Sequence, residues 1–313
     1  MQEYQFIRST VKKLLEKLPY CGKFIRANKR MMHPPGHFYS PIPLLEDIKL
    51  KEKEIFDFFP RKIAGIDLNE TEQLTLLNEF KKYYQELPFS TNKKEGLRYF
   101  FEGEVLGYGY SDAITLYCMI RHLQPKRIIE VGCGKSSCVT LDTNELFFNN
   151  SISCTFIEPY PKKFFSLVKP TDLEKVEVIP KKLQEVELSK FSTLSAGDIL
   201  FIDSTHVSKI NSDVNYIFFS ILPHLQAGVS IHFHDIFYPF EYPKKWIYSG
   251  IAWNEDYLLR AFLQYNNAFK IMFFNSFLIK FYEQEIRAAM PLLLTKAGSI
   301  WIKKIGSAKQ VVV

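Results

Sequence analysis

The sequence lacks several features that would assign a chain to a protein class at once. Its five cysteines are scattered, odd in number and without a CxxC pair, so neither a disulfide framework nor a zinc knuckle is expected. The sequence contains no run of about 18 apolar residues, so no membrane-spanning helix is expected. The first residues lack the uninterrupted apolar core of a secretory signal peptide. These absences together favour a reduced, cytoplasmic protein.

A broad basic surface is also missing. Residues 1–30 carry eight lysines and arginines against two glutamates, a net charge of +6 that equals the net charge of all 313 residues. The rest of the chain is therefore close to neutral, which argues against a nucleic-acid-binding face. Two interpretations of the basic start remain open. It is either a solvated helix or an amphipathic helix that makes weak contact with an anionic membrane surface or an acidic partner.

The first third of the chain is expected to be an accessory region. A mostly helical extension at residues 1–95 would precede a second domain at residues 96–313. The extension holds the basic helix, a turn-rich segment at residues 33–43 whose four prolines exclude a helix, and a charged helix at residues 68–87. Asn69 or Thr71 is the expected N-cap of that charged helix.

After about residue 111, short apolar strands alternate with helices. Strands are expected at residues 127–132, 153–159, 176–180, 198–203, 228–235, 269–278 and 298–304, and helices at residues 111–123, 210–222 and 283–296. Strands this apolar along their whole length are usually covered on both faces, as in a parallel sheet. The alternation predicts a doubly wound α/β domain, in which ligands bind beyond the carboxyl ends of the strands.

The loop after the first expected strand reads IIEVGCGKSS, residues 128–137. Gly132 and Gly134 let the backbone approach a ligand closely, and a helix N-terminus follows. A dinucleotide fingerprint would need a third glycine near Ser137, and Glu130 would repel a diphosphate, so a cationic ligand with an amine and a sulfonium fits better. The second strand ends in Glu158, where a carboxylate can accept both hydroxyls of an adenosine ribose, a feature that NAD-binding proteins share.

With these segments the chain resembles class I S-adenosylmethionine-dependent methyltransferases over roughly residues 95–305. Residues 128–137 are similar to the first motif of that family, and FIEP (156–159) to the second. Residues 197–236 are similar to the block across the fourth and fifth strands, above all in bacterial small-molecule and sugar O-methyltransferases. The resemblance implies a Rossmann-like seven-stranded sheet of order 3-2-1-4-5-7-6 whose last strand is antiparallel.

The resemblance also implies cofactor-binding roles. The residues are, in chain order, Glu130, Gly132, Gly134, Ser136, Ser137, Glu158, Leu183, Gln184 and Asp203. Glu130, Gly132 and Gly134 would cradle the methionyl part of S-adenosylmethionine. Ser136 and Ser137 would donate hydrogen bonds to its carboxylate. Glu158 would hold the ribose, and Leu183 and Gln184 would flank the adenine.

Methyl transfer to a hydroxyl needs a group that removes the hydroxyl proton, either a general base or a divalent metal. The catalytic candidates are His206, His234 and Asp235, which follow the fourth and fifth strands. A magnesium-type ion between Asp203 and Asp235 is a less favoured alternative, because Ile236 stands where metal-dependent relatives often have asparagine.

Three functions are compatible with these residues, and the leading one is O-methylation of a small hydroxylated or saccharide acceptor. A non-catalytic module that binds S-adenosylmethionine or S-adenosylhomocysteine would not need the histidines and aspartates at the strand ends. An NAD-dependent oxidoreductase is disfavoured by the loop sequence. The aromatic segment at residues 237–256 is expected to be a substrate lid. His232, one pleat inside the fifth strand, is expected to be a hydrogen-bonded core histidine.

Overall fold

The computed structural model describes residues 11, 14–15, 17–21, 32–101 and 108–306 of the chain. Most of the basic segment at residues 1–30 lies outside these residues. The described residues divide into two compact units, unit 1 within residues 1–58 and 244–252, and unit 2 within residues 59–243 and 253–313. This division does not coincide with the expected boundary at residue 95. Unit 1 contains the helices α3 (Leu45–Leu50), α4 (Glu52–Phe56) and α12 (Lys244–Tyr248).

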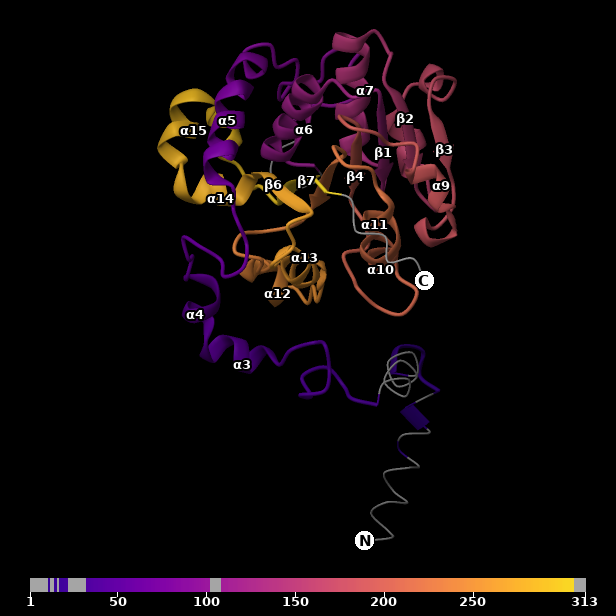
Figure 1. Cartoon of the computed structure of the whole chain (residues 1–313). Helices are drawn as coiled ribbons and strands as arrows, with labels where there is room; N and C mark the ends of the chain where they lie inside the picture. Colours follow the sequence, from indigo (N-terminus) through magenta and orange to yellow (C-terminus); the bar gives the residue numbers. More distant parts are fainter. Residues whose placement is uncertain (1–10, 12–13, 16, 22–31, 102–107, 307–313) are drawn as a thin grey trace. The chain divides into compact units, whose positions relative to one another are not determined.

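Unit 2 is built around one seven-stranded sheet of order β3-β2-β1-β4-β5-β7-β6 (Figure 1). Its strands are β1 (Arg127–Val131), β2 (Ser153–Ile157), β3 (Glu177–Ile179), β4 (Ile199–Ile202), β5 (Ser230–His234), β6 (Phe269–Phe274) and β7 (Ser299–Lys304). Strands β1 to β5 are parallel, and β7 runs antiparallel to both β5 and β6. The order and the antiparallel last strand confirm the prediction. All four residues of β4 are buried, as expected for a strand that is covered on both faces.

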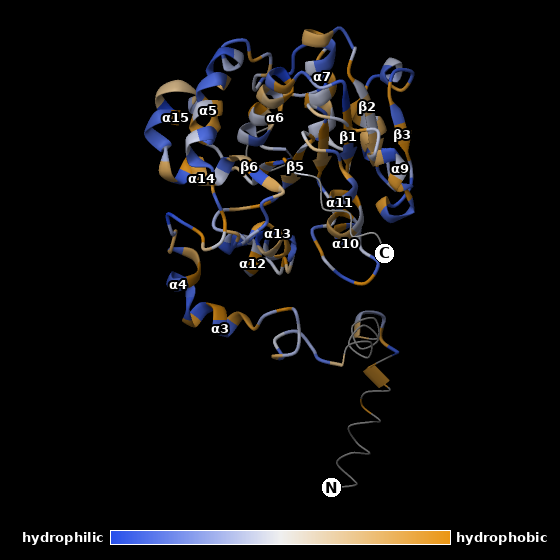
Figure 2. Cartoon of the chain, viewed as in Figure 1, coloured by the Kyte–Doolittle hydropathy of each residue, from blue (hydrophilic) through white to orange (hydrophobic). Residues whose placement is uncertain are grey.

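The helices of unit 2 pack around this sheet. They are α5 (Glu70–Tyr84), α6 (Tyr110–Leu123), α7 (Lys135–Phe148), α8 (Lys162–Leu167), α9 (Leu188–Phe191), α10 (Asp213–Tyr216), α11 (Leu222–His224), α13 (Glu255–Leu263), α14 (Asn275–Phe281) and α15 (Glu283–Ala289). A π-helical turn, η3 (Ile217–Ile221), joins α10 to α11, and single 3-10 turns lie at η1 (Pro170–Asp172), η2 (Leu183–Glu185) and η4 (Pro291–Leu293). Outer helices such as α5 and α15 carry both hydrophilic and hydrophobic segments, as helices with one face on a core should (Figure 2). None of the helices in the described part is long and apolar enough to cross a membrane.

Helix α5 belongs to unit 2 because it covers the edge strand β6. The Asn69 side chain donates to the backbone oxygen of Ile271 at 2.8 Å, and the Gln73 side-chain oxygen accepts from the backbone nitrogen of Phe274 at 2.8 Å. Asn69 lies at the N-cap position, as expected, but its side chain makes no cap hydrogen bond to its own helix. Backbone groups of an open sheet edge are thereby satisfied within the chain, which protects the edge against pairing with another strand.

A buried ion cluster attaches the segment before α6 to helix α7. The Arg98 guanidinium bonds to Asp142 at 2.7 Å and to Glu145 at 2.7 Å, and it also pairs closely with Asp172. The Asp142 carboxylate accepts from the backbone nitrogens of Arg98 and Tyr99 as well. Because Arg98 is almost fully buried, this cluster fixes the path of residues 98–99 across the domain.

Three elements begin or end at residues other than those expected from the sequence. The strand expected at residues 269–278 ends at Phe274, because the buried Asn275 side chain bonds to Thr115 and to the carboxylate of Asp112, and α14 starts there. The helix expected from residue 210 begins at Asp213, and Ile210 is 97% exposed rather than on a buried face. The helix expected at residues 283–296 is interrupted at Pro291, whose ring cannot continue it.

Candidate active site

The carboxyl ends of the central strands lie side by side. Val131 of β1 is paired with Ile157 of β2 and with Ile202 of β4, which is in turn paired with Phe233 of β5. The residues that end or follow these strands, among them Gly132, Glu158, Asp203 and His234, therefore meet at one edge of the sheet. This is where a doubly wound sheet binds its ligand.

A cavity of about 500 Å³ opens at this edge. Five of the predicted cofactor-binding residues line it, namely Gly132, Glu158, Leu183, Gln184 and Asp203. Much of the remaining wall comes from the loop after β4, residues 204–213, including the exposed Ile210. Thr205 holds this loop closed by donating its hydroxyl to Asp213 at 2.6 Å. Ile210, expected as the first residue of a helix, instead forms part of the cavity wall.

Gly132 brings the loops after β1 and β4 into direct contact. Its φ is +82°, and a Cβ atom at this position would lie 1.9 Å from the backbone oxygen of Asp203. Its backbone nitrogen donates to Ile157 at 3.0 Å, and the backbone nitrogen of Asp203 donates to Val131 at 2.9 Å. Only a residue without a side chain fits this junction.

Glu130 is fully buried beneath the glycine loop. Its Oε1 accepts hydrogen bonds from the hydroxyls of Ser136 and Ser137, each at 2.7 Å, while its Oε2 has no partner among the described residues. Burial raises the pKa of Glu130 to about 8, although the two serine hydrogen bonds act in the opposite direction. The serines therefore bind Glu130 in this structure, and their expected role toward the cofactor carboxylate stays a prediction.

Glu158 and Gln184 line the cavity from different elements, Glu158 after β2 and Gln184 in η2. One Glu158 carboxylate oxygen accepts from the backbone nitrogen of Tyr160 at 2.8 Å, which orients the side chain at the end of β2. The Gln184 amide donates to the backbone oxygen of Asn211 at 2.9 Å and so joins η2 to the loop after β4. Leu183 is buried beside it.

His206 is held between carboxylates. Its Nδ1 lies 2.8 Å from Oε2 of Glu255, and its Nε2 lies 3.3 Å from Oδ1 of Asp203 and 3.8 Å from Oδ2 of Asp235. Burial alone would lower the pKa of His206, but the hydrogen bonds to Asp203 and Glu255 raise it to about 10. In this arrangement both ring nitrogens face acids, and the ring carries a proton at neutral pH.

Glu255, the first residue of α13, is a member of the site that sequence reasoning missed. It is fully buried, accepts from the Ser204 hydroxyl at 3.2 Å, and donates its backbone nitrogen to the backbone oxygen of His206 at 3.2 Å. The Trp253 ring lies 4.4 Å from the His206 ring, measured between centroids. No motif links positions that are 49 residues apart in the chain, so only the fold reveals the pair.

His234 ends β5 and is less constrained. Its Nε2 is 3.7 Å from Oδ1 of Asp235, too far for a hydrogen bond, and its Nδ1 is buried without a partner among the described residues. The Tyr108 ring packs against it at 5.1 Å. Burial lowers the pKa of His234, but the charges of Asp235 and Asp203 outweigh burial and raise it.

His232 is a core residue, as expected. The hydrogen bonds that were also expected for its ring are absent among the described residues. His232 is fully buried, and neither ring nitrogen has a partner within the described residues. Its ring stacks on Phe201 at 4.0 Å and packs against Trp301 at 4.8 Å. Burial lowers its pKa well below the usual range, so the ring is neutral. Packing, rather than hydrogen bonding, explains its position.

Asp203, His206 and Asp235 also have the geometry of a cation site. One ligand atom from each side chain lies within 4.8 Å of the other two. The carboxylate of Glu255 on the other ring nitrogen of His206 is the arrangement that orients metal-binding histidines. Ile236 is fully buried and offers no ligand atom. The donor set of these residues fits a divalent cation.

Comparison with known proteins identifies the family of the chain. A family model described as a methyltransferase domain matches residues 129–236, from β1 to the residue after Asp235. An uncharacterized protein of Archaeoglobus fulgidus is 31% identical over 190 residues, which are 60% of this chain and 86% of that relative. The chain belongs to the class I S-adenosylmethionine-dependent methyltransferase family.

Solved structures with low sequence identity are similar to this methyltransferase in part. One is the S-adenosylhomocysteine-bound methyltransferase PaMTH1 of Podospora anserina, with 14% identity, a TM-score of 0.44, and coverage of 78% of this chain and 99% of that one. Another is TomG, an O-methyltransferase of Streptomyces achromogenes involved in tomaymycin synthesis and solved with S-adenosylmethionine, with 12% identity, a TM-score of 0.43, and coverage of 84% and 96%.

The aromatic segment at residues 237–256 is divided between the two units. Residues 244–252 belong to unit 1, and the remainder, including Trp253, belongs to unit 2. The role of the segment as a substrate lid stays a prediction.

Proposed function

We propose that this methyltransferase transfers the methyl group of S-adenosylmethionine to a hydroxyl oxygen of a small hydroxylated or saccharide acceptor. The observation that carries the proposal is the group of Asp203, His206, His234 and Asp235 at the carboxyl ends of β4 and β5. Asp203 belongs both to this group and to the cavity wall. A module that only binds the cofactor would not need ionisable side chains gathered on the acceptor side.

The cavity fits the cofactor on several points. Its volume of about 500 Å³ is within the range of cavities that hold small molecules and cofactors. Glu158 presents a carboxylate at the end of β2, and Oε2 of Glu130 is a buried polar atom without a partner in the described part. A Cβ atom at Gly134 would meet no atom within 4 Å, which leaves room beside the loop. When bound, S-adenosylmethionine supplies a methyl group on a positively charged sulfur.

The reaction is an in-line displacement in which the acceptor oxygen forms a bond to the methyl carbon while the carbon–sulfur bond breaks. The sulfur keeps the electron pair of that bond, and S-adenosylhomocysteine leaves. The hydroxyl proton must pass to a group of the protein. The chain therefore has two tasks, to orient the acceptor and to accept this proton.

His234 is the better placed of the two histidines to accept the proton. Both ring nitrogens of His206 already face carboxylates, whereas neither ring nitrogen of His234 lies within hydrogen-bond distance of one. Because Nδ1 of His234 is buried, Nε2 is the nitrogen available to an acceptor. His206 would then act as a charged donor that holds Asp203 in place.

A divalent cation is the second way to activate the hydroxyl. Asp203, His206 and Asp235 would hold it, and the cation would lower the pKa of a bound hydroxyl. The two alternatives make opposite predictions for a chelator. If EDTA abolishes methyl transfer while His234→Gln retains it, His234 is not the base.

The first experiment is calorimetry with S-adenosylmethionine, S-adenosylhomocysteine and NAD. We expect both sulfur nucleosides to bind and NAD not to bind, with Glu158→Gln weakening both at least tenfold. Labelled methyl transfer from S-adenosylmethionine to a panel of phenols, sugars and amines then identifies the acceptor atom. Micromolar binding of NAD without binding of S-adenosylmethionine, or transfer to amines alone, would contradict the proposal.

A further inference from the structure

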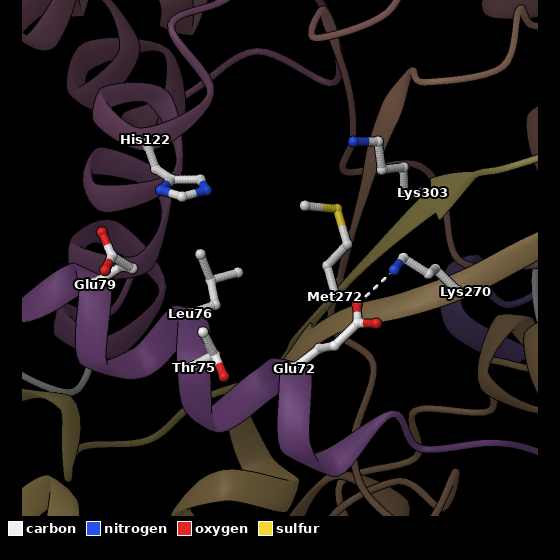
Figure 3. Close-up of a pocket in the computed structure, with 8 residues that line it drawn as sticks. All are labelled: Glu72, Thr75, Leu76, Glu79, His122, Lys270, Met272 and Lys303. Atoms are coloured by element: carbon white, nitrogen blue, oxygen red, sulfur yellow. Dashed lines mark hydrogen bonds and ion pairs between the residues drawn. The ribbon is translucent and has the colours of Figure 1, made fainter.

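A second cavity lies in unit 2 between helix α5 and strands β6 and β7, with a volume of about 280 Å³ (Figure 3). Its lining comes from four elements that are distant in sequence, and the side chains are Glu72, Thr75, Leu76, Glu79, His122, Lys270, Met272 and Lys303. Lys303 of β7 is paired both with Lys270 of β6 and with Ser230, the first residue of β5. The cavity is therefore near the amino ends of the parallel strands, at the opposite end of the sheet from the cofactor cavity.

The inner surface of this cavity is apolar. Leu76 is buried, and Figure 3 shows the half-buried Met272 with its thioether methyl pointing toward His122. Methionine is flexible and polarizable, so it adapts to the shape of an apolar or aromatic group. At roughly 30 Å³ for each water-sized group, about 280 Å³ holds on the order of nine non-hydrogen atoms.

The acids around the cavity are already neutralised by lysines. Glu72 forms an ion pair with Lys270, drawn as a dashed line in Figure 3, and Glu79 forms one with Lys82 at 2.7 Å. Hydrogen bonds from these lysines lower the pKa of both glutamates, so both carboxylates are charged and occupied. The lining as a whole carries no excess negative charge, since Lys270 and Lys303 balance the two glutamates.

Two nitrogen groups at the cavity remain available. The side chains of Lys303 and His122 form no hydrogen bond or ion pair with other residues in the described part of the chain. Burial and the charge of Lys82 lower the pKa of His122, so its ring is neutral at pH 7 and can donate one hydrogen bond. A positive charge and a neutral donor thus border an apolar surface.

We propose that this cavity binds a small carboxylate with an apolar body. The carboxylate oxygens accept hydrogen bonds from Nζ of Lys303 and from the His122 ring, and the apolar body packs against Leu76 and Met272. The inference goes beyond methyl transfer and assigns a second ligand site to the domain. Its position away from the cofactor cavity makes binding there independent of S-adenosylhomocysteine.

Methyl-labelled methionine NMR of the full chain tests this site with benzoate as the probe. The chain has six methionines, and the signal of Met272 is assigned by its loss in Met272→Leu. We expect benzoate to shift the Met272 signal with a dissociation constant in the millimolar range, as a ligand of this size allows. Benzyl alcohol, which lacks the charge, and acetate, which lacks the ring, should bind at least tenfold more weakly.

Two matched variants locate the contact. Lys303→Gln should weaken benzoate binding at least tenfold, while Lys175→Gln, an exposed lysine near the β3 edge of the sheet, should leave it unchanged. Unaltered signals of the other methionines and unchanged affinity for S-adenosylhomocysteine show that each variant is folded. The proposal is wrong if the Met272 signal stays fixed at saturating benzoate, if benzyl alcohol binds equally well, or if Lys303→Gln binds like the wild type.

Discussion

The junction at Gly132 allows a direct test of how the cofactor cavity is built. Alanine at this position would adopt a φ of +82°, which costs an L-residue about 1–2 kcal/mol. Its Cβ would also lie 1.9 Å from the backbone oxygen of Asp203, so the loops after β1 and β4 must separate by more than an ångström. That separation strains or breaks the hydrogen bond from Asp203 to Val131, worth about 1 kcal/mol.

These two contributions sum to a loss of about 2–3 kcal/mol in the free energy of unfolding for Gly132→Ala. For a domain of this size, such a loss lowers the midpoint of thermal unfolding by roughly 5–10 °C. Differential scanning calorimetry measures the shift. Urea unfolding followed by circular dichroism gives the free energy independently.

Gly134→Ala is the matched control, two residues along the same loop. Gly134 has an extended φ of −171°, and a Cβ atom there would meet no atom within 4 Å. We expect its stability to stay within about 1 kcal/mol of the wild type, while its affinity for S-adenosylhomocysteine falls because the methyl group occupies space beside the cofactor. The reasoning fails if Gly132→Ala melts within about 2 °C of the wild type, or if both variants lose the same stability.

Three further predictions concern buried groups. Arg98→Met should destabilise the domain by about 3–5 kcal/mol in urea unfolding, because it leaves buried carboxylates unpaired; Arg127→Met, at an exposed arginine, should cost less than about 1 kcal/mol. The pKa of Glu130 is raised to about 8 in the folded state, so its contribution to stability is full below the unfolded value near 4.5 and is lost as the pH rises toward 8. Glu130→Gln should therefore flatten the fall in unfolding free energy between these pH values, and an unchanged pH slope would contradict the assignment. Gln73→Leu should cost about 1–3 kcal/mol by leaving the backbone nitrogen of Phe274 without its acceptor, measured by thermal unfolding.

The sheet could be predicted because each of its strands is encoded by a short stretch of neighbouring residues. Each central strand is a short apolar run followed by a polar or glycine residue, and each run is separated from the next by a helix. Buried parallel strands require such runs, and the chain order then restricts the topology. The residues that end the strands were identified for the same reason, since parallel strands place their carboxyl ends together.

The differences from expectation arose where a distant contact decides the local structure. Phe274 ends β6 because Asn275 bonds across to Asp112 and Thr115, whose positions are about 160 residues earlier. The unit boundary lies near residue 58 because Asn69 and Gln73 bond to the edge of β6, about 200 residues later. Local propensity correctly assigns each of these segments to helix or strand. It carries no information about the distant residues that bond to the segment.

The two histidines of the site show how such distant contacts determine chemistry. In the sequence, His206 and His234 look alike, since each lies at the end of a strand near an aspartate. In the fold, Glu255 approaches the second nitrogen of His206 and leaves that ring between acids, whereas no carboxylate of the described residues lies within hydrogen-bond distance of His234. Under the proposed function a base needs a free nitrogen, so Glu255 leaves His234 rather than His206 as the candidate base. Because Glu255 is the first residue of α13, the start of that helix determines the charge of His206.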